Sequence, residues 1–185
     1  PEALMFETGA NEWRRFDEWP PADRHVQALH AARGNGLSWT PPGNDGGYDE
    51  FVSDPAKPVP FTEDVARGMT RAYMTDDQRF AGRRPDVVVY QTEPLDEDIT
   101  IAGPVLADLW VSTSEGDADW VVKLIDVHPG DHEDYPGIRE GMRTSGYQMM
   151  VRSEVIRGRY RNSYEDPEPF AVSYTHLTLP TNGCV

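Results

Sequence analysis

The chain has 185 residues, enough for one domain with a hydrophobic core, and 32 acidic against 17 basic side chains give a net charge of −15. An acidic surface repels nucleic-acid phosphates and anionic lipid headgroups, so we expect no nucleic-acid and no membrane partner. The chain contains no run of about 18 apolar residues, which a membrane-spanning helix would need. The single cysteine, Cys184, lies in the C-terminal tail, which excludes a disulfide, a cysteine-ligated zinc site and a thiol nucleophile from the rest of the chain.

The first part of the chain predicts short strands separated by turns, as expected from its 16 glycines and 16 prolines. Residues 3–7 predict a strand that ends in a turn over 8–11. Residues 13–21 are aromatic and charged and end in two prolines. Residues 25–32 fit either one strand or two helical turns, and the turn at 34–36 leads into the next apolar residues.

A long irregular connection is predicted over residues 41–84, where proline and glycine are frequent. A long ordered loop in a compact domain is uncommon and often covers or lines a site, and the alternative is a mobile linker. The aromatic and methionine content favours a packed loop. These side chains are Tyr48, Phe51, Phe61, Met69, Tyr73, Met74 and Phe80.

The strand signal is strongest after Pro85, where no helix is predicted. Within residues 99–112, Leu106 and Trp110 alternate with Val105, Leu109 and other apolar residues, which indicates a strand with one buried face. The predicted strand segments are residues 87–92, 99–112, 120–127 and 147–156, with a polar loop over 130–141.

The chain contains no recognisable catalytic motif. No serine lies in a Gly-x-Ser-x-Gly pattern, and no glycine-rich phosphate loop is present. His25 and His30 have no serine or cysteine nucleophile in a known arrangement beside them. We therefore expect no catalytic residue in this chain and no cofactor.

Two clusters of charged residues stand out as candidate ligand sites. The acidic stretch fits no calcium loop and is interpreted as a solvated connection between strands, so we expect no metal site. The arginines are interpreted as ion-pair partners of the acidic surface rather than as an anion site. The acidic stretch comprises Asp126, His128, Asp131, His132, Glu133 and Asp134, and the arginines are Arg83, Arg84, Arg157, Arg159 and Arg161.

The tail from Val172 to Thr181 reads Val-Ser-Tyr-Thr-His-Leu-Thr-Leu-Pro-Thr, which is the translation of a transposon sequencing adapter in one frame. A GCT codon at Ala171 fits that frame. We expect residues 171–185 to be such a translated adapter, excluded from fold reasoning.

Four other stretches carry recognisable motifs. They are Phe-Glu-Thr-Gly-Ala-Asn-Glu-Trp-Arg-Arg at 6–15, Asp-Pro-Ala-Lys-Pro-Val-Pro at 54–60, Asp-Gln-Arg at 77–79, and the strands from Tyr90 to Ser163. With these motifs residues 1–170 resemble the C-terminal part of the cocaine esterase and X-Pro dipeptidyl-peptidase group of serine hydrolases. Within that group the chain is most similar to the α-amino acid ester hydrolases and glutaryl-cephalosporin acylases.

The resemblance implies an all-β fold, a galactose-binding-like jelly-roll β-sandwich that is C-terminally truncated. Residues 1–21 would be the end of an α/β-hydrolase domain and its connector, and residues 22–170 a partial jelly roll. The Ser-Asp-His triad of the family would lie upstream, outside this chain, so the chain alone should be inactive.

The resemblance also implies a role for the chain in a parent hydrolase of small-molecule esters or amides. Its partner would be the upstream α/β-hydrolase domain of the same chain, and a homo-oligomer is compatible with this reading. We expect the loop over 68–80 to form a wall of the substrate pocket through Met69, Tyr73 and Met74. The alternatives are a stand-alone carbohydrate-binding β-sandwich and a purely structural docking domain. The compartment and the substrate stay open.

Overall fold

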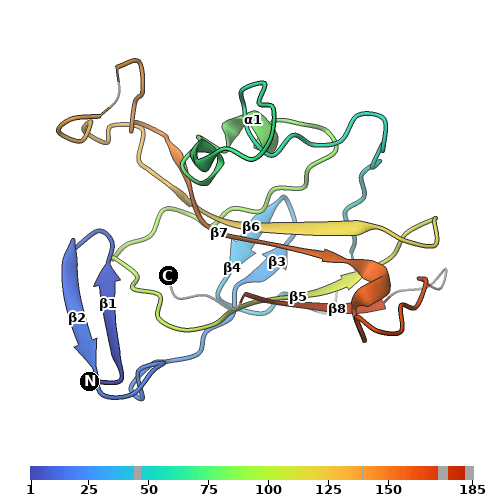
Figure 1. The fold of residues 1–185 in the computed structure, drawn as a ribbon, viewed down its shortest axis with the longest axis horizontal. Coiled ribbons are helices and arrows are strands. Elements are labelled where there is room, and N and C mark those ends of the chain that lie inside the picture. The colour runs from blue at the N-terminus through green and yellow to red at the C-terminus, as the bar shows by residue number, and fades with distance from the viewer. Residues whose placement is uncertain (44–46, 139, 171–174, 182–185) are drawn as a thin grey trace. The chain divides into compact units, whose positions relative to one another are not determined.

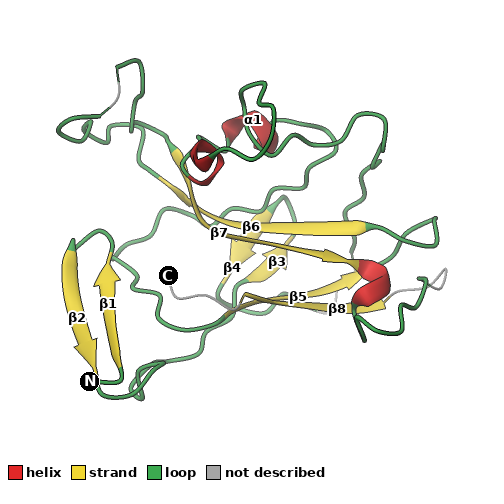
Figure 2. Ribbon diagram, viewed as in Figure 1, coloured by secondary structure: helices red, strands yellow, loops and turns green. Residues whose placement is uncertain are grey.

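The computed structural model describes residues 1–43, 47–138, 140–170 and 175–181 (Figure 1). Strands make up most of the regular secondary structure in these ranges, so the predicted all-β class is confirmed (Figure 2). The strands are β1 (Ala3–Glu7), β2 (Glu12–Phe16), β3 (His30–Ala32), β4 (Gly36–Ser38), β5 (Val105–Val111), β6 (Asp119–Val127), β7 (Gln148–Arg157) and β8 (Thr175–Thr181). The helical elements are the 3-10 turns η1 (Arg71–Met74) and η2 (Gly158–Tyr160) and the helix α1 (Arg79–Gly82). None of the helices in the described ranges has the length and apolar character that crossing a bilayer requires.

The strands pair two by two, β1 with β2, β3 with β4, β5 with β8 and β6 with β7. The chain forms two compact units, each made of segments that are separate in the sequence. The first unit comprises residues 1–24, 100–124 and 151–185, and the second comprises 25–99 and 125–150. Strands β6 and β7 therefore contribute residues to both units. The domain boundaries expected after residues 21 and 170 stay predictions.

In the first unit, β1 and β2 form an antiparallel hairpin around the predicted turn, where Asn11 has φ 56°. The strand over 12–16 was not predicted, because three charged residues hide its alternation. Pairing with β1 stabilises this strand through a contact across the hairpin. Phe6 lies opposite Trp13, and their ring centroids are 5.3 Å apart in an edge-to-face contact.

The core of the first unit lies on one face of β5. The predicted alternation is confirmed, since Leu106 and Trp110 are 61% and 72% exposed whereas Val111 is buried. The buried side chains Val111, Phe170 and Leu177 form the centre of this core. Packed around them are Ala107, Leu109, Trp120, Val122 and Ile156.

Strand β8 pairs with β5 antiparallel over seven residues, from Val105 opposite Thr181 to Val111 opposite Thr175. Leu177 from β8 is fully buried. The truncation expected after Phe170 does not leave this edge of β5 unpaired, because residues 175–181 cover it. Residues 171–174 and 182–185, with Cys184, lie outside the described residues. Any β-compatible sequence can pair in this way, so the adapter origin of the tail stays a prediction.

The connection after β7 is held against the start of β6. The backbone N–H of Gly158 donates to the Ala118 carbonyl (2.8 Å). Arg157 and Arg159 form ion pairs with Asp119 and Asp117. The interpretation of these arginines as ion-pair partners is therefore confirmed, and it holds also for Arg161 with Glu168 and for Arg84 with Asp86.

In the second unit, β3 and β4 flank the predicted turn, where Gly34 and Asn35 have φ 72° and 62°. Glycine and asparagine adopt this left-handed conformation at the lowest steric cost. Of residues 25–32, only His30–Ala32 is a strand, and no helix forms there. The strand expected over 87–92 is wrong.

Residues 87–92 form an isolated parallel bridge between Gln91 and Gly36 instead of a strand. The Leu37 N–H donates to the Gln91 carbonyl (2.8 Å), and the Gln91 N–H donates to the Asn35 carbonyl (2.9 Å). Strand β4 is only three residues long. The β-branched residues before Gln91 therefore have no long partner strand, and propensity alone does not form one.

Candidate functional site

The long connection of the second unit contains a closed loop over residues 62–76, which directly precedes the segment around α1 (Figure 1). The Thr62 hydroxyl donates to the Asp76 carboxylate and so joins the two ends of the loop. Next to this closure, the rings of Phe61 and Tyr73 pack edge to face with centroids 6.0 Å apart. A compact loop of this length with its ends joined is an Ω-loop, a kind of segment that frequently carries function. The packing that was predicted for this connection is seen between Phe61 and Tyr73, whereas Met69 and Met74 are 80% and 56% exposed.

The loop is anchored to the start of β7. The Gln78 N–H donates to the Gln148 carbonyl (3.1 Å), and Gln78 is 1% exposed. Its side-chain amide donates to the Asp76 carbonyl (2.8 Å). The Tyr147 hydroxyl donates to the Thr75 carbonyl. Residues from distant parts of the sequence therefore set where the end of loop 62–76 lies.

Asp77 is the charged group of this anchor. One carboxylate oxygen accepts from the backbone N–H groups of Arg79 (3.1 Å) and Gln148 (3.4 Å), and the other accepts from the Arg79 side chain (2.7 Å). Burial raises the pKa of Asp77, but the hydrogen bonds and charge of Arg79 and the Gln148 N–H outweigh burial and lower the pKa from 3.8. Burial and the charges of Asp77 and Asp76 raise the pKa of Tyr147, so its hydroxyl keeps its proton at neutral pH.

The lowered pKa predicts how stability depends on pH. Ionised Asp77 stabilises the folded chain at pH values above its unfolded pKa of 3.8, and this contribution is lost as the pH falls below 3.8 through the folded pKa. We expect wild type and Asp77→Asn to differ most in unfolding free energy near neutral pH and to converge in acid. Denaturant unfolding across pH measures this. Asp64→Asn, at an exposed position in loop 62–76, is the control. A difference between wild type and Asp77→Asn that grows in acid would contradict the assignment.

The three predicted wall residues lie in loop 62–76, which overlaps only part of the predicted wall segment 68–80, because helix α1 begins at Arg79. Met69 and Met74 are 80% and 56% exposed, and Tyr73 is half-buried against Phe61. Val65 is fully exposed in the same loop and was not predicted. The loop therefore presents apolar side chains to its surroundings, whereas polar groups hold its ends.

Sequence reasoning missed the residues that hold the loop. Thr62 and Tyr147 are single polar residues without a pattern, and their partners lie 14 and 72 residues away. Only Asp77 has a local signal, because an aspartate that binds the backbone N–H two residues on forms a common turn. Asp77 and Arg79 are the first and last residues of the Asp-Gln-Arg motif, whose sequence by itself indicates only the family resemblance.

The acidic stretch after β6 is built around histidines. The His128 and His132 rings stack with centroids 4.6 Å apart, and Tyr135 packs edge to face on His132 at 5.2 Å. The expectation of a solvated loop fits the exposed Asp131 and is wrong for His128, which is 8% exposed. The reason is tertiary, since this ring packs into an aromatic cluster. In the described ranges, no group of three or more His, Cys, Asp or Glu side chains is placed to hold a metal ion.

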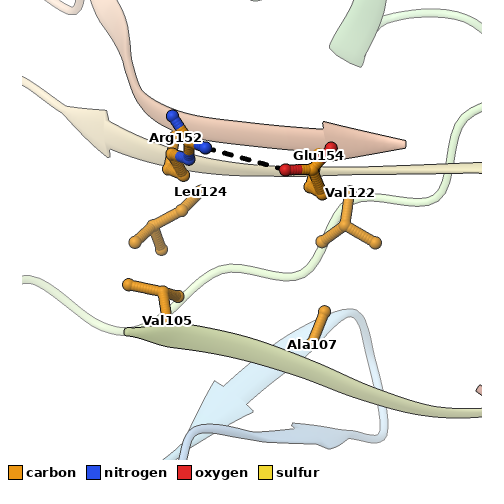
Figure 3. A pocket seen from close by; sticks show the side chains of 6 residues that line it. All are labelled: Val105, Ala107, Val122, Leu124, Arg152 and Glu154. Atoms are coloured by element: carbon orange, nitrogen blue, oxygen red, sulfur yellow. Dashed lines mark ion pairs between the residues drawn. The ribbon is translucent and has the colours of Figure 1, made fainter. Parts of the chain in front are cut away.

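The described residues form two hollows that differ in size. In the first unit, Val105 and Ala107 from β5 point toward Val122 and Leu124 from β6 (Figure 3). They line a cavity of about 30 Å³, which is room for water and not for a substrate. An open depression of about 490 Å³ in the second unit is lined by Glu50, Phe51, Val52, Pro85 and Asp86.

Two charged residues also line the small cavity. Arg152 and Glu154, both from β7, form an ion pair of 3.6 Å there (Figure 3). The Arg152 Nε atom is buried and has no hydrogen-bond partner among the described residues. The residues that line the two hollows include no nucleophile with a base beside it. Outside them, the Ser145 hydroxyl donates to the Gly130 carbonyl.

Comparisons with known proteins identify the domain. The family model described as the X-Pro dipeptidyl-peptidase C-terminal non-catalytic domain matches residues 1–172. Cocaine esterase of Rhodococcus sp. (strain MB1 Bresler) is 29% identical over 180 residues, which is 90% of this chain and 28% of the esterase. A putative serine esterase of Mycobacterium bovis is 26% identical over 173 residues, 92% of this chain and 24% of that protein.

Solved structures agree with this match. An aminopeptidase from the marine sediment archaeon Thaumarchaeota archaeon superposes with a TM-score of 0.86 at 38% identity, covering 97% of this chain and 30% of that one. An α-amino acid ester hydrolase superposes with a TM-score of 0.84 at 37% identity, covering 96% of this chain and 30% of that one. The chain thus spans less than a third of each of these relatives. It belongs to the family of X-Pro dipeptidyl-peptidase C-terminal non-catalytic domains, as the resemblance in its sequence predicted.

Proposed function

We propose that the chain is the non-catalytic domain of a serine hydrolase that acts on small-molecule esters or amides. In this proposal, loop 62–76 forms one wall of the pocket in which an upstream α/β-hydrolase domain of the same chain binds its substrate. The relatives named as an esterase, an aminopeptidase and an ester hydrolase support the reaction class. The observation that carries the role of the loop is its construction, with anchored ends and exposed Met69 and Met74.

The chemistry would be divided between the two domains. In the parent, a serine assisted by histidine and aspartate would attack the substrate carbonyl and form an acyl-enzyme. The loop would contribute apolar contact with the acyl group. Methionine suits this role because its unbranched, polarisable side chain adapts to groups of different shape. Such a wall selects among substrates without taking part in bond breaking.

Kinetics of the intact hydrolase test this role. We expect Met74→Ala to lower kcat/KM about tenfold for substrates with a large apolar acyl group, and to leave acetyl substrates nearly unchanged. The physical reason is that only a large acyl group would reach the wall and lose contact with it. Tyr73→Ala is expected to act in the same direction, with a further loss from its contact with Phe61.

Val26→Ala is the matched control, because Val26 is 90% exposed and lies outside loop 62–76. It should leave kcat/KM for all substrates unchanged. Unchanged kinetics in Met74→Ala and Tyr73→Ala across the whole substrate series would reject the wall. That result would favour the docking-domain alternative, in which changes in this domain alter stability and not substrate choice.

A further inference from the structure

Thr62 is a buried residue whose hydroxyl closes loop 62–76. Thr62 is 5% exposed, although it begins a loop whose other residues are mostly open to solvent. Its hydroxyl donates to the Asp76 carboxylate, 14 residues later, so one hydrogen bond closes the loop. Leaving a buried hydroxyl without a hydrogen-bond partner costs free energy. The contact between Thr62 and Asp76 therefore constrains where the two ends of the loop lie.

Tyr147 provides the second constraint. It is 5% exposed, and its hydroxyl donates to the carbonyl of Thr75, the residue before Asp76. Its own backbone is held in turn, since the Tyr147 N–H donates to the Thr144 carbonyl (3.1 Å) and the Tyr147 carbonyl accepts from the His128 N–H (2.9 Å). The end of the loop therefore depends on a side chain that belongs to the segment leading into β7.

The loop has little else to hold it in place. Among residues 62–76, all of which the structure describes, no apolar side chain is fully buried. Its other ordered features are the Gln78 side-chain amide that donates to the Asp76 carbonyl (2.8 Å), the ring contact of Tyr73 with Phe61 and the turn of η1. Segments with few buried apolar contacts open locally at low free energy. The two buried hydroxyls should therefore decide how often the loop departs from this conformation.

We infer that Thr62 and Tyr147 are positioning residues, which select substrates by fixing the place of Met69 and Met74 without touching the substrate themselves. This inference rests on the proposed function of loop 62–76 as a pocket wall. A wall that is held in one place excludes acyl groups of the wrong shape, and a loosened wall admits them and binds the preferred ones less well. Loss of either hydroxyl should therefore change KM for large acyl groups more than kcat for small ones.

The test uses Thr62→Val and Tyr147→Phe in the intact hydrolase, since each substitution removes a hydroxyl and keeps the shape of the side chain. Hydrogen exchange of the loop amides is expected to rise roughly fivefold, whereas amides of β5 should keep their rates. KM for substrates with large apolar acyl groups is expected to rise roughly threefold, with kcat for acetyl substrates unchanged. Thr62→Ser, which restores a hydroxyl, should return both quantities to the wild-type values.

Val111→Ala is the control for general destabilisation. Val111 is buried in the core of the first unit, outside loop 62–76. Its truncation should lower stability and leave both loop exchange and KM unchanged. If Val111→Ala changes KM as much as Thr62→Val does, the effect is general destabilisation and the inference is overturned.

The two proposals fail in different ways. Unchanged loop exchange in Thr62→Val and Tyr147→Phe overturns the positioning role, whatever the kinetics show. Faster exchange with unchanged KM, while Met74→Ala does alter substrate choice, also overturns it and leaves the wall intact. Faster exchange with no kinetic change in any of these variants, Met74→Ala included, overturns the wall itself and the selection role that rests on it.

Discussion

Replacing Gly158 with alanine is expected to lower the free energy of unfolding by about 3 kcal/mol, near the upper end of what overpacking costs. A Cβ atom at Gly158 would lie 1.7 Å from the Cε2 atom of Phe170. The ring cannot easily move aside, because Phe170 is 6% exposed, packs with Trp120, and lies under the Arg161 guanidinium at 5.0 Å. Thermal or denaturant unfolding of the variant measures the loss.

Two further variants make this prediction specific to the steric contact. Gly116→Ala should be close to neutral, because a Cβ atom there meets nothing within 4 Å. In the Gly158→Ala background, Phe170→Ala should be far less harmful than in wild type, where truncating a buried phenylalanine costs about 3–5 kcal/mol. Strictly additive effects of the two substitutions would show that the glycine is not needed for contact with the ring.

Truncating Leu177 to alanine is expected to lower the free energy of unfolding by about 2–5 kcal/mol, the usual range for a buried leucine. Leu177 is 0% exposed and lies at the centre of the core with Val111 and Phe170. Its strand covers the edge of β5. The removed methyl groups would leave a cavity between side chains that cannot all collapse into it. Equilibrium unfolding in denaturant measures the effect.

Thr178→Ala is the control for Leu177→Ala, because Thr178 is the next residue of β8 and is exposed. We expect a change of less than about 1 kcal/mol at this position. Equally small effects of the two substitutions would mean that residues 175–181 do not take part in the folded core. That outcome would favour the prediction that residues 171–185 are a translated adapter appended to the domain.

The charged and aromatic loop after β6 shows where local patterns mislead. Its residues are mostly acidic, and a solvated loop was the natural prediction. The structure uses some of these groups internally: the Asp134 carboxylate accepts from the Thr144 N–H (2.9 Å) and from the Arg143 side chain (2.7 Å). His128 lies inside an aromatic cluster. Composition reports how polar a segment is on average and does not report which side chain turns inward.

The sequence by itself determined the strands whose signal is periodic, the tight turns, and the family. The alternation over Val105–Val111 predicts a half-buried strand because side chains in a strand point to opposite faces in turn, and Gly34 with Asn35 predicts a turn because these residues tolerate positive φ. Tertiary structure alone decided that residues 87–92 form no strand, that Phe170 requires a glycine at 158, and that Thr62 and Tyr147 hold loop 62–76. These outcomes depend on partners far away along the chain, and a single hydrogen bond or steric contact between distant residues leaves no period or motif in the sequence.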